Sequence, residues 1–161
     1  MAARRVALVI GVAVLVFVLD RITKGAVVAS LPLGASREVI GDVVRITHVR
    51  NSGAAFGLLP ERTTLLSILS VFAVLAIVYY YRKIALNSPL VAGTLGMQLG
   101  GAIGNLVDRL GQGYVVDFVD VGIGNVRYWS FNVADSSIVV GIALVTILLY
   151  LEEKKVERRP A

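Results

Sequence analysis

The sequence predicts an α-helical membrane protein in which four transmembrane helices carry a small β-sheet at one end. Its 161 residues are 57% hydrophobic, with a mean hydropathy of +0.79, and only 17% are charged. A soluble domain is typically about a quarter charged. Long apolar stretches alternate with short polar segments, and the excess of basic residues falls on only one side of these stretches. We therefore expect a single membrane-embedded domain over 1–161.

The first apolar stretch is the shortest, because its unbroken part, Val6–Leu19, has only 14 residues. A cleaved signal peptide is one interpretation of such an N-terminal segment. However, Asp20 and Lys24 stand where small residues would precede a cleavage site. A first transmembrane helix over 6–28 with a charged outer end fits the sequence better.

The other apolar stretches predict transmembrane helices over 64–81, 89–107 and 132–151. A helix needs about 20 residues to cross the hydrocarbon core, and the first and last of these stretches comfortably meet this requirement. The middle stretch is rich in glycine, which suits close packing of helices in lipid. The two connecting segments, 29–63 and 108–131, are expected outside the bilayer.

The charge distribution predicts the orientation of the helices. With four spans both termini lie on the same side, where eight basic and three acidic residues occur. The other side carries eight of each sign. Because positive charge concentrates in cytoplasmic segments, we place both termini in the cytoplasm. Topology and anionic lipid then account for the net charge of +5, so no nucleic-acid partner is expected.

The outer segments contain two candidate β-strands. Residues 43–49 are β-branched and partly alternating, which is typical of a strand. Residues 123–129 contain a Gly-Asn turn signal followed by a second short strand. Together they predict a small outer sheet that rests on the helices. His48, the single histidine, is expected as a surface residue of this sheet, and the absence of cysteine excludes disulfides and thiolate chemistry.

Polar residues from all parts of the chain fall at the outer level in this topology. Polar groups at membrane depth are costly and usually have a partner or a function. Four residues apart on a helix, Asp20 and Lys24 are expected to form a structural pair. A structural network and a functional site both remain open for the others. The set comprises Asp20, Lys24, Asn51, Asn105, Asp108, Arg109, Asp117, Asp120, Asn132 and Asp135.

Asp135 and Asp117 suggest two different roles from their local sequence. Asp135 opens the last span, where it would complement the helix dipole beside a cap residue such as Ser130 or Asn132. Asp117 lies in the expected outer loop, in "GYVVDFVD", and its apolar neighbours favour a function. The sequence contains no Ser/His or Cys/His alternative at this level, so two carboxylates suggest aspartyl chemistry. The residues alone leave open which two aspartates would act.

The proposed chemistry depends on two carboxylates that share a proton. Like charges a few ångströms apart do not both ionise comfortably, so one carboxyl stays protonated. The ionised one takes a proton from water, which attacks a peptide carbonyl, and the protonated one donates to the carbonyl oxygen or the leaving amine.

Five motifs in a fixed order resemble those of the bacterial lipoprotein signal peptidases, the type II signal peptidases. The similarity extends from Asp20 to Ile138. The resemblance implies an aspartyl protease that cleaves diacylglyceryl-modified prolipoproteins on the N-terminal side of the lipidated cysteine. The motifs are "DRITK" at 20–24, "NSGAAFG" at 51–57, "GGAIGNLVDR" at 100–109, "VVDFVD" at 115–120 and "FNVADSSI" at 131–138.

The same resemblance implies a site and an architecture. Its catalytic pair is Asp117 and Asp135. It further implies a four-helix bundle with a small outer β-cradle and a short outer helix, inhibition by globomycin-type cyclic peptides, and no metal or cofactor. The expected location is the bacterial cytoplasmic (inner) membrane, with the active site at the extracytoplasmic face. The supporting and substrate-binding residues are Asp20, Lys24, Asn51, Asn105, Asp108, Arg109 and Asn132.

Two other functions are less consistent with this sequence than a protease. A small carboxylate-dependent proton- or cation-coupled transporter would hold its acids at mid-helix depth and often contains internal repeats. Here the acids gather at helix ends, and the sequence shows no repeat. A non-enzymatic scaffold would not need the polar cluster. Gly53, Gly57 and Pro60 suggest in addition a lid over 52–62.

Overall fold

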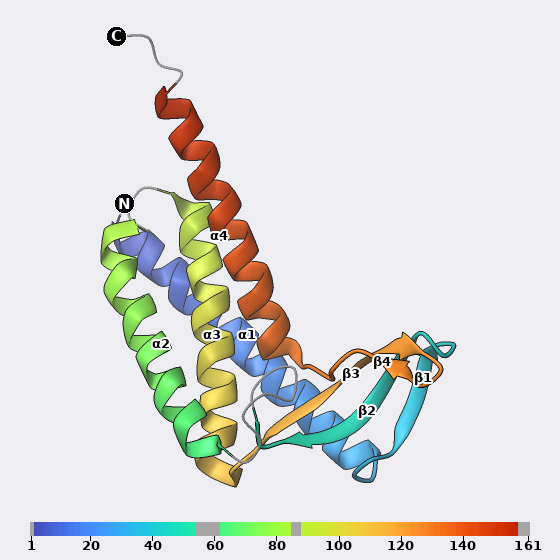
Figure 1. The fold of residues 1–161 in the computed structure, drawn as a ribbon. Helices are drawn as coiled ribbons and strands as arrows, with labels where there is room; N and C mark the ends of the chain where they lie inside the picture. The colour runs from blue at the N-terminus through green and yellow to red at the C-terminus, as the bar shows by residue number, and fades with distance from the viewer. Residues whose placement is uncertain (1, 54–61, 85–87, 158–161) are drawn as a thin grey trace.

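The computed structural model describes residues 2–53, 62–84 and 88–157. Its helices form a bundle, and its strands form a sheet at the end of the bundle opposite the start of α1 and the end of α4 (Figure 1). The helices are α1 (Ala2–Ser30), α2 (Thr63–Ile84), α3 (Pro89–Gln112) and α4 (Val133–Glu157).

Three of these helices are long and apolar enough to cross a membrane, namely α1, α3 and α4. The apolar part of α2 within the described residues, Thr63–Tyr79, is shorter, so the fourth span stays a prediction. Each helix continues a few residues beyond its predicted span. The reason is that hydropathy marks the part of a helix that lies in hydrocarbon, whereas good helix formers such as the glutamates and lysines of the last turns of α4 continue it into the polar region.

Helix α3 is the centre of the bundle, because it packs against each of the other three helices. Its glycines permit the close approach that the sequence predicted. A Cβ atom on Gly100 would lie 2.5 Å from the carbonyl oxygen of Ala13 on α1, and one on Gly101 would lie 2.4 Å from that of Ala134 on α4. Because glycine has no side chain, the backbone of α3 can lie in van der Waals contact with the backbones of α1 and α4, which stabilises helix packing in lipid.

The sheet is antiparallel with the strand order β1-β2-β3-β4. Its strands are β1 (Ser36–Ile40), β2 (Val44–Asn51), β3 (Val115–Ile123) and β4 (Val126–Arg127). The predicted strand near 43–49 corresponds to β2, and the predicted Gly-Asn turn connects β3 to β4, with Gly124 at a φ of 57°.

Two features of the sheet correct the sequence predictions. Strand β1 was not predicted, and Asp117 and Asp120 lie on β3 instead of in a loop. The valines that alternate with these aspartates supply the β-branched side chains that favour a strand. Acidic residues within the run concealed this preference, because Asp is depleted in strands.

His48 is buried, with 4% of its surface exposed, although a surface position was expected. Its Nδ1 donates a hydrogen bond of 2.9 Å to the carbonyl oxygen of Leu31, just beyond the end of α1. The register of β2 against β3 shifts between Ile46 and Val49. An extra residue in a strand changes the direction of the side chains beside it, and here the ring turns towards α1.

The short outer helix is not confirmed. The described parts of the outer segments contain strands and turns but no further helix. Residues 54–61 lie outside the described residues, and with them lies most of the lid suggested over 52–62.

Candidate active site

Asn132 and Asp135 form a reciprocal cap at the start of α4. The backbone N–H of Asp135 donates to Asn132 Oδ1 at 2.9 Å, and the backbone N–H of Asn132 donates to Asp135 Oδ2 at 3.2 Å. This is the geometry of a capping box, which satisfies two N–H groups that a helix start leaves unpaired. The predicted capping role of Asp135 is therefore confirmed, with Asn132 as the cap residue.

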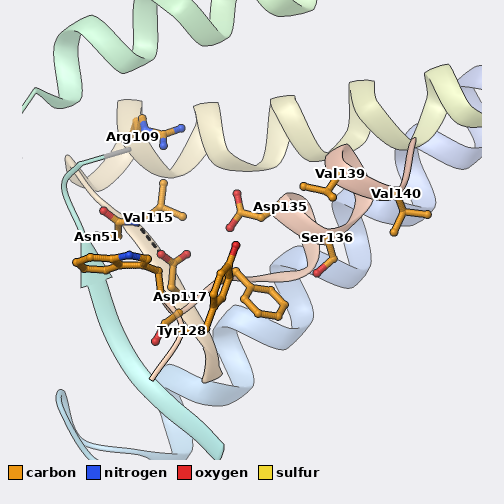
Figure 2. A pocket seen from close by; sticks show the side chains of 12 residues that line it. Asn51, Arg109, Val115, Asp117, Tyr128, Asp135, Ser136, Val139 and Val140 are labelled. Atoms are coloured by element: carbon orange, nitrogen blue, oxygen red, sulfur yellow. Dashed lines mark hydrogen bonds between the residues drawn. The ribbon is translucent and has the colours of Figure 1, made fainter. Parts of the chain in front are cut away.

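The same Asn132 also contacts Asp117 on β3. Its Nδ2 donates to Asp117 Oδ1 at 2.7 Å, and the Asn132 side chain is fully buried. The other oxygen of Asp117, Oδ2, accepts from Asn51 Nδ2 at 2.8 Å, a bond drawn in Figure 2. Asn51 is held in turn by the backbone N–H of Gly53, which donates to its Oδ1 at 2.9 Å. Both oxygens of Asp117 therefore accept a hydrogen bond from an amide.

Asp135 has an equivalent environment. Its Oδ1 accepts a hydrogen bond of 2.7 Å from Asn105 Nδ2 on α3, while its Oδ2 accepts the backbone bond from Asn132. Asp117 and Asp135 line one cavity of about 340 Å³, and both carboxylates point into it (Figure 2). Each carboxylate is thus held by two donors and faces the same space.

Burial controls the electrostatics of Asp117, which is only 2% exposed. Burial raises the pKa of Asp117 from 3.8 to about 7, and the nearby charge of Asp135 acts in the same direction. The hydrogen bonds from Asn51 and Asn132 lower this pKa in part. Because desolvation and a neighbouring like charge both disfavour the ionised form, the pair favours holding one proton near neutral pH.

Lys24 lies behind the two carboxylates, in a buried network that connects α1, α3 and α4. Its ammonium group is buried and donates to Asp20 Oδ2 at 2.7 Å and to Asn105 Oδ1 at 3.0 Å, and it lies 2.7 Å from Asp108 Oδ2. Asp20 Oδ1 accepts from the backbone N–H of Ala134 at 3.0 Å. The predicted pair of Asp20 and Lys24 is confirmed. Because Lys24 donates a hydrogen bond to Asn105 Oδ1, the amide nitrogen of Asn105 is directed towards Asp135.

Arg109, in the last turn of α3, lies at the edge of the cavity and is half-buried (Figure 2). Its charge is close enough to act on Asp135 and Asp117. Its Nε is buried and has no hydrogen-bond partner among the described residues. A cationic donor at the rim of a cavity that holds two carboxylates can contact a polar group of a bound ligand.

The remaining wall of the cavity is largely apolar and aromatic. The sequence predicted a turn and a short strand over 123–129 and did not assign Tyr128 and Trp129 to the site that they line. The one sequence feature that could have indicated this role is their position shortly before the motif at 131–138, which contains Asp135. The wall residues are Val115, Tyr128, Trp129, Ser130, Phe131, Ser136, Val139 and Val140.

The structure divides the sequence-predicted residues into three groups. Asn51, Arg109, Asp117 and Asp135 line the cavity. Asn105 and Asn132 contact the carboxylates, whereas Asp20, Lys24 and Asp108 form the buried network behind them. Asp120 belongs to none of these groups, because its Oδ1 accepts from Arg127 Nε at 2.8 Å in the outer sheet.

Comparison with known proteins identifies related chains. The family model described as Signal peptidase (SPase) II matches residues 12–151. A bacterial membrane enzyme whose structure was solved by the in meso method at 2.3 Å resolution is 34% identical, with a TM-score of 0.85 over 95% of this chain and 93% of that chain. A second bacterial membrane enzyme, solved by the same method at 1.9 Å resolution, is 36% identical, with a TM-score of 0.76 over 88% of this chain and 91% of that one.

Proposed function

The chain belongs to the signal peptidase II family of multi-pass membrane proteases, which cleave the signal peptides of lipoproteins, and we propose that Asp117 and Asp135 are its catalytic pair. One observation carries this proposal. Asn132 hydrogen-bonds both carboxylates, so residues from β3 and α4 meet at one cavity. The raised pKa of Asp117 supports a pair that shares one proton. Nothing among the described residues of the site favours the transporter alternative.

The proposed reaction begins with a water molecule held between the two carboxyl groups. The ionised carboxylate takes a proton from this water, and the resulting oxygen nucleophile attacks the scissile carbonyl carbon. The protonated carboxyl donates its proton to the carbonyl oxygen, which gives a neutral tetrahedral intermediate. Collapse of this intermediate breaks the C–N bond, and the carboxyl that received the water proton supplies it to the leaving amine. The other carboxylate takes back a proton from one of the two hydroxyl groups as the carbonyl re-forms, so the pair again holds one proton. Asn51, Asn105 and Asn132 keep the two carboxyl groups oriented through these steps.

The cavity supports a lipidated substrate. Its polar end contains the two carboxylates, while Val139 and Val140 extend its wall along α4, where they are 66% and 45% exposed. A diacylglyceryl-modified cysteine would place its peptide bond at the polar end while its acyl chains remain among lipids. Globomycin-type inhibitors are proposed to occupy the same cavity. The basic excess on one side supports cytoplasmic termini in the bacterial inner membrane and an active site on the extracytoplasmic face.

Cleavage of a diacylglyceryl-modified precursor by purified protein in detergent tests the proposal. Asp117→Asn and Asp135→Asn, each made alone, are expected to reduce turnover by at least ~10³-fold, because each removes a proton-transfer group of a two-carboxyl reaction. Asp120→Asn is the matched control, since Asp120 lies on the same strand and pairs with Arg127 outside the cavity. Wild-type turnover in either catalytic variant, or no cleavage by the wild type, would contradict the proposal.

A further inference from the structure

The outer sheet has one polar face. Residues that pair across antiparallel strands lie on the same face, and Glu38 pairs with Arg45, which pairs with Asp120. Arg127, opposite Gly122, lies on this face as well, because Asp120 and Gly122 are alternate residues of β3. These charged side chains define the polar sheet face.

The opposite face is apolar near the hairpin turns, whereas Arg37, which pairs with Ile46, lies further along the same face. Val44 pairs with Val121, and Ile123 pairs with Val126. Since alternate residues of a strand share a face, these four residues lie on the same face as Asp117. We call Val44, Val121, Ile123 and Val126 the apolar sheet face. It continues along β3 to the candidate active site.

The apolar sheet face is most exposed near the two hairpin turns. Ile123 and Val126 are 73% and 82% exposed, and Ile40, at the end of β1 beside this face, is 64% exposed. Contiguous apolar side chains with such exposure mark a contact surface for another molecule or for a membrane.

The charges near these turns are paired within the sheet. Arg127 donates from Nε to Asp120 Oδ1 at 2.8 Å and from Nη1 to the carbonyl oxygen of Asp42 at 2.7 Å. Arg45 also hydrogen-bonds the Asp42 carboxylate. These bonds neutralise the cations and anions of the two turns against each other. We call the end of the sheet that carries the two hairpin turns the sheet tip. The sheet tip can approach an apolar phase because its charges are paired, whereas an unpaired charge would be costly to desolvate.

The sheet tip lies at the level of the predicted membrane surface. In Figure 1 the hairpin turns lie beside the helices, at about the level where α4 begins, and not beyond the ends of the bundle. The first turn of α4 is also the start of a candidate membrane span, Val133–Lys155. A sheet that projects sideways at this level lies over the surrounding bilayer. Exposed apolar side chains on the outer half of α1, such as Ile22 at 61% exposure, continue the lipid-facing surface toward it.

We propose that the apolar sheet face is a membrane-interface anchor, seated at the boundary between headgroups and acyl chains of the leaflet on the sheet side. Its occupant is the lipid of that leaflet, and the polar sheet face points to water. Apolar side chains buried to this depth bind a membrane interface. The anchor fixes the height of β3 and hence of Asp117 relative to the lipid. On the proposed function, an acylated substrate in the same leaflet then reaches the carboxylates without leaving the interface.

Site-directed spin labelling tests this placement directly, because the chain contains no cysteine. Single variants Val126→Cys on the apolar face and Glu38→Cys on the polar face, where the side chain is 63% exposed, carry a nitroxide label. The full chain is reconstituted in vesicles of phosphatidylethanolamine and phosphatidylglycerol. The label at 126 is expected to be accessible to oxygen and protected from a water-soluble nickel chelate, and the label at 38 is expected to show the reverse. Equal access of the nickel chelate to both labels overturns the proposal.

Pairing with a second copy of the chain would also protect Val126, and a second measurement separates the two cases. Labels at 126 on two paired copies interact magnetically, and dilution with unlabelled protein removes that interaction. Lipid contact predicts no such interaction and no effect of dilution. A dipolar signal that dilution removes therefore overturns the lipid proposal in favour of a dimer interface.

Activity provides an independent readout. Replacement of Ile123 and Val126 together by Asp is expected to lower kcat/KM about tenfold in vesicles, because charges near an interface are modestly unfavourable there, and to leave it near wild type in detergent. Asn125→Asp in the turn between them is the control. Equal loss in vesicles and detergent overturns the anchor role. If the wild type cleaves no precursor, the proposed function fails, yet the label accessibilities still decide the anchor.

Discussion

The Nδ2 atom of Asn132 donates a hydrogen bond to Asp117 Oδ1 at 2.7 Å, and the backbone of the same residue donates to Asp135. One buried amide residue thus sets the relative position of two carboxylates on different elements. Asn132→Ala is expected to lower kcat roughly 10²-fold with little change in KM, because misplacement of reacting groups by about 1 Å has effects of this size. Cleavage assays in detergent measure it, with the exposed turn residue Asn125→Ala as control. Turnover near wild type in Asn132→Ala would show that the carboxylates do not need this connection.

The pH dependence of cleavage should report the titration of Asp117. Because its pKa is raised to about 7, we expect kcat/KM to fall as the pH rises above about 7 and the pair loses its shared proton. Asn51 donates to Asp117 and lowers its pKa. Asn51→Ala should therefore raise this pKa and move the alkaline limb to higher pH. A pH–rate profile of both proteins measures the shift, and a limb that stays in place or moves to lower pH contradicts the assignment.

Asp117→Asn should stabilise the protein at alkaline pH even though it abolishes activity. The folded-state pKa lies above the unfolded value of 3.8, so the contribution of Asp117 to stability is fully present below 3.8 and is lost as the pH rises through about 7. At pH 8 the free energy of unfolding of the variant should increase by roughly 1–4 kcal/mol. The lower end of this range is expected because the amide nitrogen of the new asparagine would face the amide donor of Asn51 or Asn132. Thermal unfolding in detergent at pH 8 and pH 4 measures this difference. An equal change at both pH values would exclude a titration effect.

Lys24 should contribute more to stability than Arg21, although both contact Asp108. The side chain of Lys24 is 3% exposed and that of Arg21 is 45% exposed. Lys24→Met leaves buried carboxylates without their cation, which costs about 3–5 kcal/mol. Arg21→Met removes a cation that water also solvates, so about 1 kcal/mol or less is expected. Thermal unfolding of the two variants compares them, and equal losses would contradict a buried network centred on Lys24.

Gly101 should resist substitution because α4 packs directly on it. A Cβ atom there would lie 2.4 Å from the carbonyl oxygen of Ala134 and 2.5 Å from Ser137 Oγ. Gly101→Ala therefore displaces the first turn of α4, which carries Asp135, and is expected to cost about 1–3 kcal/mol together with activity. Gly93→Ala on the same helix is the matched control, since its Cβ would meet no atom within 4 Å and alanine favours helix. Similar effects of the two substitutions on melting temperature and turnover would argue against the close contact.

The hydropathy of the sequence was sufficient to predict a helical membrane protein and to locate its helices to within a few residues. Apolar content over about 20 residues is a property of each segment alone. The predicted pair of Asp20 and Lys24 follows equally from local spacing on one helix. The prediction failed where neighbours decide the conformation. Asp117 lies on a strand because β2 pairs with β3, and His48 is buried because a bulge turns it toward α1.

By itself the sequence determined the class of the protein, its family motifs and the set of polar residues from which the site is drawn. Only the tertiary structure decided which of these residues meet. Asp135 begins a helix and faces Asp117 because Asn132 hydrogen-bonds both, whereas Asp120, three residues away from Asp117, is held by Arg127 in the outer sheet. The physical reason is that local sequence sets helix and strand preferences, while strand register and the packing of α4 on glycines of α3 bring distant side chains together.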